Sequence, residues 1–242
     1  MLIQNYIDNT FLKPEKEEIL KEKFEQTFKN NFRGLCIPLN YLDLALRAKK
    51  LFPSSTKIVI VDNFPMGKRD YFFYNFGGNI KGYRLDSFIK ENFIEELDVV
   101  IPLFYLKQKG WNNGIVNWFL NHYYYLSLFS IKWIIEEPYW TWEEMYDIIE
   151  HIYKHWKTVG KKVPVFIKSN TGFVPRKRPL GEVVNRFIET VKEITNGEFG
   201  IKISGGVKTY LEAIQIAKLG GIIGTSSGLE ILEEQNNEQT KS

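Results

Sequence analysis

Short apolar runs of β type recur along this chain and alternate with segments of helical period. The runs are NYID (5–8), GLCIP (34–38), KIVIV (57–61), LDVVI (97–101), IKWII (131–135), VPVFIK (163–168), GIKIS (200–204) and GIIGT (221–225). Apolar residues repeat with a helical period in segments 15–28, 41–51, 142–155, 183–194 and 209–219. Strands that alternate with helices pair in parallel, so the sequence predicts an α/β fold, a single (β/α)8 TIM barrel. An open doubly wound sheet is the alternative.

Residues 1–242 are expected to form one domain, because barrels of this kind reach such a length without dividing. Residues 235–242 are polar and are expected to fray. Segment 62–86 is rich in glycine and aromatic residues and predicts a long loop, either a lid or an Ω-loop packed on itself. Segment 118–129 predicts an aromatic helix that is buried or faces another subunit.

Composition and charge narrow the class of protein. The chain is 44% hydrophobic and 25% charged, which is typical of a globular protein. A net charge of +3 is too small for a nucleic-acid binder but suits a small anionic substrate. The single cysteine, Cys36, rules out an internal disulfide and a zinc site built on cysteines. No secretory leader or membrane span is recognisable, so we expect a cytoplasmic protein without membrane or nucleic-acid partners.

Two lysines stand where the catalytic end of a barrel would be. Lys168 ends one β-type run, and Lys202 lies in the next run, while Asp98 lies in an earlier one. Two amines held close in a dry pocket cannot both stay protonated cheaply, so the pKa of at least one should fall. A neutral lysine attacks an aldehyde to form a Schiff base, and a nearby carboxylate can move the protons.

The last two runs end in motifs suited to an anion. Gly205 and Gly206 follow one run, and GTSS (224–227) ends the other before a final short helix. Backbone N–H groups at such turns, together with a helix start, favour a phosphate. The basic run RKR (176–178) either steers that phosphate or lies in a solvated loop. His151 and His155 have a metal-binding spacing without a third ligand, so we expect no metal.

These motifs are similar to those of a known family. The chain resembles deoxyribose-phosphate aldolase from about Ile7 to Leu232. The motifs that carry the resemblance are IKSNTGF around Lys168, IKISGGVKT around Lys202, IGTSSGLEIL near the end, and, more weakly, IDNTFLKP, LCIP, NFPMG, LDVVIP and IKWIIEE. The resemblance implies a metal-independent class I aldolase of deoxyribonucleotide salvage, without an organic cofactor. It would reversibly cleave 2-deoxy-D-ribose 5-phosphate into D-glyceraldehyde 3-phosphate and acetaldehyde.

The resemblance also implies roles for individual residues. Lys168 would form the Schiff base, Lys202 would lower its pKa, and Asp98 would relay protons with a water molecule. The residues implied to line the substrate pocket or hold the phosphate are Asp8, Thr10, Cys36, Thr171, Gly172, Gly205, Gly206, Gly224, Ser226 and Ser227. Homodimers are common in the family, and segment 118–129 is a candidate interface.

The chain departs from the family pattern at several places, and two of them, an aromatic insertion after NFPMG and the basic run 176–178, bear on substrate identity. Asn9 stands where many members have histidine, Asn170 stands where they have serine, and the chain ends without the tyrosine that some relatives place in the site. None of these positions carries the imine. Two alternatives remain: a Schiff-base aldolase or lyase for another phosphorylated sugar, and a non-catalytic paralogue that only binds phosphate.

Overall fold

Eight parallel strands close into a barrel in chain order, each paired with its sequence neighbour and the last paired with the first. The structure, a computed structural model, describes residues 1–62, 94–103, 106, 117, 120–121, 130–160 and 163–240. The strands are β1 (Ile7–Thr10), β2 (Gly34–Pro38), β3 (Lys57–Asp62), β4 (Glu96–Val100), β5 (Ser130–Ile134), β6 (Val165–Lys168), β7 (Gly200–Ser204) and β8 (Ile222–Thr225). The predicted TIM barrel is confirmed, and the open sheet is excluded.

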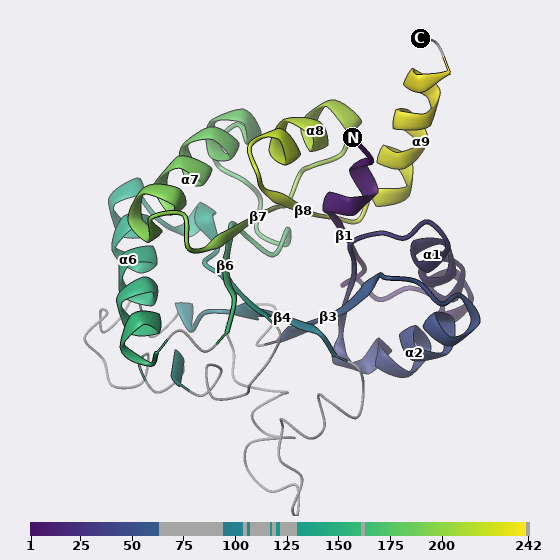
Figure 1. Cartoon of the computed structure of the whole chain (residues 1–242), viewed down its shortest axis with the longest axis horizontal. Helices are drawn as coiled ribbons and strands as arrows, with labels where there is room; N and C mark the ends of the chain where they lie inside the picture. The colour runs from purple at the N-terminus through teal and green to yellow at the C-terminus, as the bar shows by residue number, and fades with distance from the viewer. Residues whose placement is uncertain are drawn as a thin grey trace, which may run out of the picture.

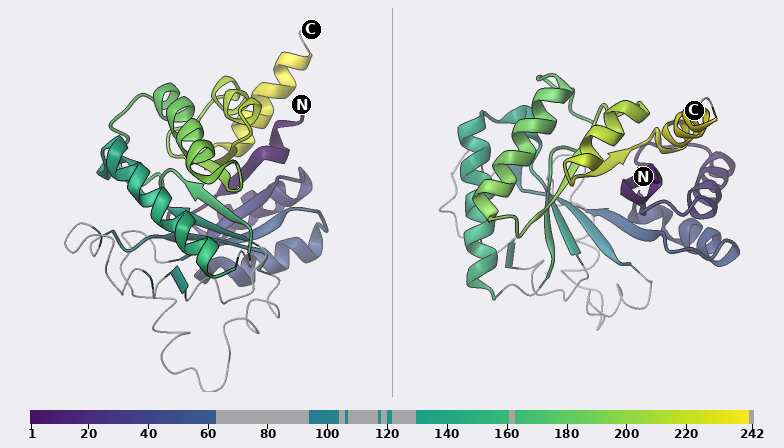
Figure 2. Two further views of the ribbon diagram at one scale, coloured as in Figure 1. Left: turned by 60° about the vertical axis from the view of Figure 1, so that its left-hand side comes forward. Right: turned by 45° about the horizontal axis from the view of Figure 1, so that its top comes forward.

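Helices cover the outside of the barrel (Figures 1 and 2). Among the described residues the α-helices are α1 (Glu17–Lys29), α2 (Leu42–Leu51), α6 (Trp142–Thr158), α7 (Leu180–Thr195), α8 (Tyr210–Lys218) and α9 (Gly228–Gln239). Short 3-10 helices are η1 (Ile3–Tyr6), η2 (Leu39–Tyr41) and η4 (Glu137–Tyr139). Thr141 and Thr209 start α6 and α8 with capping boxes, each completed by a glutamate three residues later. These helices match the predicted segments to within a few residues.

The structure differs from the sequence prediction at the two ends of the chain. Strand β1 begins at Ile7, whereas the prediction placed a strand over 5–8, because η1 occupies Ile3–Tyr6. Helix α9 continues to Gln239, so residues 235–239 are helical where a frayed tail was predicted. Gln235 is buried and bonds both ends of its amide to the N-terminal segment, accepting from Ile3 N at 3.2 Å and donating to Met1 O at 2.6 Å.

The two faces of most strands differ in character. Most side chains that point outwards are apolar and buried under the helices, as at Leu35, Leu97 and Trp133, while Asn9 and Asp62 are polar exceptions. Side chains that point inwards include aspartate, glutamate and lysine, which register across neighbouring strands, as Asp98 does with Lys132. A TIM barrel is usually filled by branched apolar side chains. Here the outer layer supplies the hydrophobic core, and the inside of the barrel holds charged groups.

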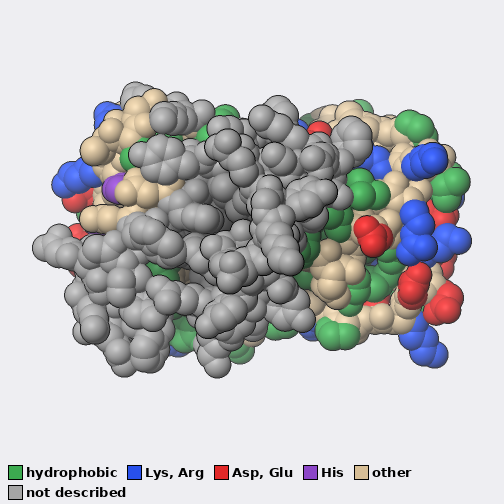
Figure 3. Space-filling view, turned by 90° about the horizontal axis from the view of Figure 1, so that it is seen from below, with side chains coloured by type: hydrophobic (Ala, Val, Ile, Leu, Met, Phe, Trp, Pro, Cys, Tyr) green, Lys and Arg blue, Asp and Glu red, His purple; other side chains and the backbone are tan. Residues whose placement is uncertain are grey.

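Two observations bear on the outer surface of the described residues. None of the helices described is both long and apolar enough to cross a bilayer. On the described part of the face in Figure 3, acidic and basic side chains are interspersed and do not form a stripe of one sign. This distribution agrees with the small net charge.

Candidate active site

The barrel brings the carboxyl ends of its strands to one rim, and the predicted residues gather there. Lys168, Ser204, Thr225 and Thr10 are the last residues of β6, β7, β8 and β1. Lys168 and Lys202 occupy the same register position on neighbouring strands, so their side chains point to the same side of the sheet. The rim of a parallel barrel is where such enzymes place their active sites.

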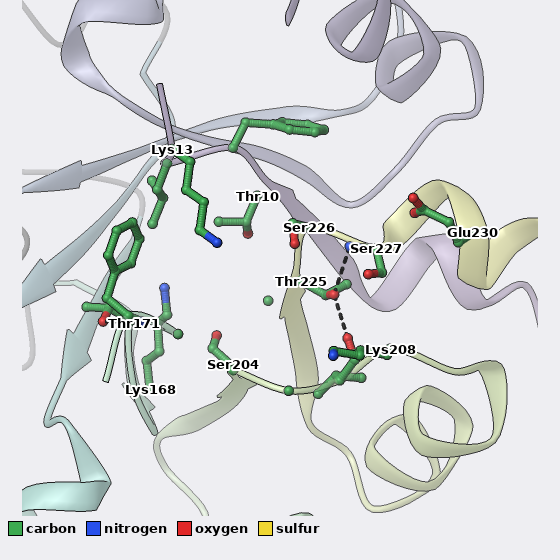
Figure 4. Close-up of a pocket in the computed structure, with 18 of the residues that line it drawn as sticks. Thr10, Lys13, Lys168, Thr171, Ser204, Lys208, Thr225, Ser226, Ser227 and Glu230 are labelled. Carbon is green, nitrogen blue, oxygen red and sulfur yellow. Dashed lines mark hydrogen bonds between the residues drawn. The ribbon is translucent and has the colours of Figure 1, made fainter. Parts of the chain in front are cut away.

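A cavity of about 400 Å³ opens at this rim. It is large enough for a small phosphorylated sugar. Nine of the predicted residues line it: Thr10, Lys168, Thr171, Gly172, Gly205, Gly206, Gly224, Ser226 and Ser227. In Figure 4 the Lys168 amine faces the cavity from one side, with Ser204 and the Thr225–Ser227 turn across from it. The sequence therefore predicted most of the wall.

The other four predicted residues lie beneath the cavity. Asp8, Cys36, Asp98 and Lys202 are completely buried and do not line its wall. Lys168 Nζ and Lys202 Nζ each lie 2.7 Å from Asp98 Oδ2, so the two nitrogens are no further apart than twice that distance. The predicted catalytic residues are thus in direct contact, with one carboxylate oxygen shared between the two amines.

These groups belong to a closed circuit of ion pairs inside the barrel, which we call the ion-pair ring. Its members alternate in sign and run in the order Asp98, Lys132, Glu96, Arg33, Asp8, Lys202 and back to Asp98. Each link joins an acidic to a basic side chain across the barrel interior. With three acids and three bases, the ring is electrically neutral.

Each link of the ring is short. On one side, Lys132 Nζ lies 3.2 Å from Asp98 Oδ1 and contacts Glu96 Oε2, whose other oxygen lies 2.9 Å from Arg33 Nη2. On the other, Arg33 Nη1 lies 2.5 Å from Asp8 Oδ1, while Asp8 Oδ2 lies 2.6 Å from Lys202 Nζ. Lys168 contacts the ring only through Asp98, and Lys57 contacts it only through Glu96, so each adds a positive charge to a neutral ring.

The ring holds its own members in their charged forms. Burial alone would raise the pKa of Asp98, but the adjacent Lys168, Lys202 and Lys132 outweigh burial and hold that pKa well below its usual range. Burial alone would lower the pKa of Lys202, but Asp8 and Asp98 raise it above its ordinary value. The expected fall in the pKa of one amine is therefore not found at Lys202, which stays an ammonium ion.

Cys36 is a neutral neighbour of this cluster. Its Sγ lies 3.6 Å from Asp98 Oδ2 and 4.0 Å from Lys202 Nζ. Burial raises the pKa of the Cys36 thiol to about 11. Lys202 acts to lower that pKa, and the negative charge of Asp98 offsets part of this lowering. A thiol in this state is a poor nucleophile at neutral pH, so Cys36 packs beneath the lysines as a small apolar group.

Sequence reasoning missed three members of the ring. Lys132 carried the same signal as Lys168, a lysine within an apolar β-type run, and period-two alternation would have placed it inside the barrel. Glu96 precedes the predicted run 97–101, and Arg33 precedes the run 34–38, so neither stood inside a predicted strand. Their partners are far apart in sequence, and no local pattern identifies such pairs.

The glycine turns at the rim have the backbone geometry expected of an anion cradle. Gly172, Gly205 and Gly206 all have positive φ, between 79° and 84°. A Cβ on Gly205 would collide with the Asn170 amide, which also accepts a hydrogen bond from Gly172 N at 2.9 Å. In Figure 4, Ser227 N donates to Thr225 Oγ1, which donates to Val207 O and so ties the two turns together.

Two residues of the basic run 176–178 brace the rim, while Lys177 is exposed as the solvated-loop reading predicts. Arg176 donates to Ser204 O at 2.6 Å and Gly205 O at 2.7 Å, so it holds the glycine turn from behind. Arg178 pairs with the buried Glu137 at 2.6 Å and donates to Trp140 O. Both arginines are partly buried braces of the rim, not solvated side chains.

Two predicted segments fall largely outside the described residues. The aromatic loop 62–86 is described only at Asp62, and most of the aromatic segment 118–129 is also outside, so both expectations stand as predictions.

Lys13 is an additional cation that sequence reasoning did not select. It lines the cavity, and Figure 4 shows its side chain directed towards the open space near Thr10.

Comparisons with known proteins agree with this site. No protein-family model matches the chain. A curated deoxyribose-phosphate aldolase of Clostridium tetani is 28% identical over 97% of this chain and 99% of its own length. One from Thermococcus kodakarensis is 28% identical, with 96% of each chain covered. The sequence similarity therefore extends over nearly the whole chain, which confirms the resemblance drawn from the motifs.

Solved structures give the same result for the fold. A structure described as "QR15, an Aldolase" is 26% identical and has a TM-score of 0.75, covering 99% of this chain and 98% of that one. A deoxyribose phosphate aldolase from Aeropyrum pernix, described as tetrameric, is 21% identical with a TM-score of 0.70, covering 98% and 92%. At 21% identity, the second match is evidence for the barrel fold and for nothing more.

Proposed function

We propose that this protein is a class I aldolase that reversibly cleaves 2-deoxy-D-ribose 5-phosphate into D-glyceraldehyde 3-phosphate and acetaldehyde. The observation that carries the proposal is the position of Lys168, whose amine faces the cavity while its only carboxylate partner among the described residues is Asp98. The names of the curated relatives support the same reaction.

Charge balance supports Lys168 as the nucleophile. An amine must be neutral to attack a carbonyl carbon. The six members of the ion-pair ring sum to zero charge, so a protonated Lys168 adds positive charge to a buried site. Uncompensated buried charge is costly, and this cost is the physical reason for proposing that Lys168 attacks as the neutral amine.

The proposed reaction then follows from a single imine. Lys168 Nζ attacks C1 of the open-chain sugar, water leaves, and a protonated imine forms. The C3 hydroxyl loses its proton, and the C2–C3 bond breaks as its electron pair moves towards the imine nitrogen. D-glyceraldehyde 3-phosphate leaves, C2 of the remaining enamine takes up a proton, and water releases acetaldehyde. The imine itself is the electron sink, so the proposed mechanism requires neither a metal nor an organic cofactor.

Asp98 and Lys202 are assigned the proton steps. Asp98 contacts both amines through one oxygen, which places it beside every proton that enters or leaves the imine nitrogen. The pKa of Lys202 is raised because Asp8 and Asp98 outweigh burial, so it remains a donor and a fixed cation next to the reaction. A water molecule between Asp98 and the C3 hydroxyl would complete the relay.

The rim opposite Lys168 is assigned to the phosphate. The turns at 205–206 and 224–227 offer backbone N–H groups and the hydroxyls of Ser226 and Ser227. Lys13 also lines this cavity, and no carboxylate among the described residues pairs with it, so it adds a cation for the substrate. A dianionic phosphate bound at these turns would anchor the sugar with its aldehyde towards the Lys168 amine.

Borohydride trapping with 2-deoxyribose 5-phosphate is the test of the proposed function. Sodium borohydride reduces the imine to a stable amine, and peptide mass spectrometry then locates it. We expect one adduct, on Lys168, together with release of D-glyceraldehyde 3-phosphate in the untreated enzyme. An adduct on another lysine would contradict the mechanism, and no adduct with intact substrate binding would favour the non-catalytic paralogue.

The phosphate assignment is tested by replacing Gly205 with alanine. Alanine at φ 79° is strained, and its Cβ would meet the Asn170 amide, so the turn must shift. We expect KM for the phosphorylated sugar to rise about tenfold or more, while activity on unphosphorylated 2-deoxyribose changes little, since about 1.4 kcal/mol is tenfold. Gly181→Ala is the matched control, because its Cβ would meet nothing within 4 Å. An equal loss on both sugars would argue against a phosphate cradle there.

A further inference from the structure

We propose that Arg33 and Glu96, which lie outside the cavity, are positioning residues that set the charge of the ion-pair ring and thereby the pH range in which Lys168 reacts. The inference rests on the proposed function, in which Lys168 is the nucleophile. It adds two residues to which neither the family resemblance nor the relatives' names assign a role.

Both residues are built into the barrel far from its open rim. Glu96 is the first residue of β4, and its side chain is 1% exposed. Arg33 precedes β2, and its side chain is 14% exposed. Neither lines the cavity at the rim. Any influence on the substrate must therefore pass through the groups that they contact.

Glu96 is surrounded by cations from three residues, as Asp98 is. Its oxygens contact Lys132 and lie 2.7 Å from Lys57 Nζ and 2.9 Å and 3.0 Å from the two terminal nitrogens of Arg33. Lys132 and Arg33 hold the pKa of Glu96 at about 2, although burial and the nearby Asp8 would raise it. Glu96 therefore remains an anion at every pH at which the enzyme would be assayed.

Two paths connect this pair to Lys168. Lys132 links Glu96 to Asp98, the partner of Lys168. Arg33 links Glu96 to Asp8, and Asp8 holds Lys202 against the same Asp98 oxygen. A change of charge at Arg33 or Glu96 therefore alters how strongly Asp98 attracts Lys168. The side chains in these contacts are buried except Arg33, which is 14% exposed, so screening is weak.

The titratable groups around Lys168 come from five strands and from the segment after β5. They are Asp8 on β1, Cys36 on β2, Asp98 on β4, Lys132 on β5, Lys202 on β7 and Glu136 after β5. The pKa of Cys36 is about 11 and that of Glu136 is raised, in each case because of burial. Asp62 on β3 registers with the outward-facing Val99, so it points away from the interior. Glu136 forms no ion pair with any described lysine or arginine, but its hydrogen bonds from Thr171 and the positive charge of Lys168 partly offset the effect of burial on its pKa.

The sign of each effect follows from electrostatics. Glu96→Gln removes a negative charge, so the Lys168 ammonium becomes less stable and loses its proton at lower pH. Arg33→Gln removes a positive charge, so the ammonium becomes more stable and persists to higher pH. A unit charge acting through a protein interior moves a titration by about one pH unit. The two variants should therefore shift the rising limb of kcat/KM in opposite directions.

The experiment measures kcat/KM for 2-deoxyribose 5-phosphate between pH 5 and 10 in both variants. The pH dependence of kcat/KM reports the titration of the free enzyme's essential acid and base. We expect the rising limb to move about one unit to acid in Glu96→Gln and about one unit to alkali in Arg33→Gln. The double variant should return towards the wild-type profile. Glu95→Gln is the matched control, since Glu95 pairs with Lys49 outside the barrel and should cause no shift.

Lys57→Gln covers the case in which a buried variant does not fold. Lys57 contacts Glu96 Oε1, the oxygen that Arg33 Nη2 also contacts. The Lys57 side chain is 43% exposed, so its loss should disturb folding less than the loss of Arg33. We expect a smaller alkaline shift, of the same sign as that of Arg33→Gln, because solvent screens this charge. Thermal melts followed by circular dichroism identify any variant that is unfolded.

Trace acetylation of Lys168 at each pH separates this inference from the proposed function. The labelling rate follows the neutral fraction of the amine and needs no turnover. Opposite shifts in labelling support the inference even if the sugar is not the substrate. Shifts of the same sign, or none in the folded variants, overturn it, whether or not the enzyme cleaves deoxyribose 5-phosphate.

Discussion

Lys168→Met is expected to abolish imine trapping and to lower turnover by a factor on the order of 10⁴ or more, as removal of a nucleophile does in other enzymes. Methionine fills nearly the same volume but has no amine. Because Lys168 contacts the ion-pair ring only through Asp98, the ring itself stays closed in this variant. The fold should therefore survive, and the loss of a surplus buried charge should leave the melting temperature equal or higher.

The measurement is kcat with deoxyribose 5-phosphate, together with borohydride trapping and a thermal melt. Lys218→Met, at the end of α8 on the exposed surface, is the matched control and should leave all three unchanged. Substantial turnover in folded Lys168→Met would refute the Schiff-base role. A large drop in melting temperature would show instead that Lys168 is needed for the structure.

Lys202→Met is expected to cause the second largest loss, and with a different pH dependence. Lys202 is a fixed cation beside Lys168, since the pKa of Lys202 is raised by Asp8 and Asp98 against the effect of burial. Its removal makes the surroundings of Lys168 more negative, so the Lys168 ammonium persists to higher pH. We expect turnover near pH 7 to fall by a factor of roughly 10² to 10³, as for loss of a proton-transfer group, with partial recovery above pH 9.

This variant should also be less stable, unlike Lys168→Met. Asp8 and Asp98 each lose a partner at 2.6 Å and 2.7 Å, and breaking a buried pair costs about 3–5 kcal/mol. Urea unfolding measures that loss, and kcat/KM from pH 6 to 10 measures the recovery. If activity stayed low at high pH in the folded variant, Lys202 would act in proton transfer and not only through its charge.

The contrast between Lys168 and Arg33 explains what the sequence could predict. A lysine at the end of an apolar β-type run is conspicuous locally, and parallel strands must bring their ends to one rim. The pairing of Arg33 with Glu96 joins residues 63 positions apart and depends on which strand neighbours which. Local periodicity fixes the face of a side chain but not its partner.

Strand β1 illustrates a second limit. Asp8 and Asn9 have low intrinsic strand preference, so propensity favoured the residues before them. In the barrel, Asp8 is held by Arg33 and Lys202, and the Asn9 amide nitrogen donates to Thr27 Oγ1 at 2.9 Å, so both residues have partners in a buried strand. Tertiary contacts outweigh local preference here.

The pairing of β1 with β8 has a consequence for biosynthesis. Ile7 registers with Ile223, so the first strand lacks one of its two neighbours until nearly the whole chain has left the ribosome. Gln235 on α9 adds a further tie to Met1 and Ile3. Closing so long a loop is entropically costly and slow. The nascent chain therefore holds an open edge with charged inward-facing groups, and the buried charges of Asp8 and Lys202 meet only when translation is almost complete.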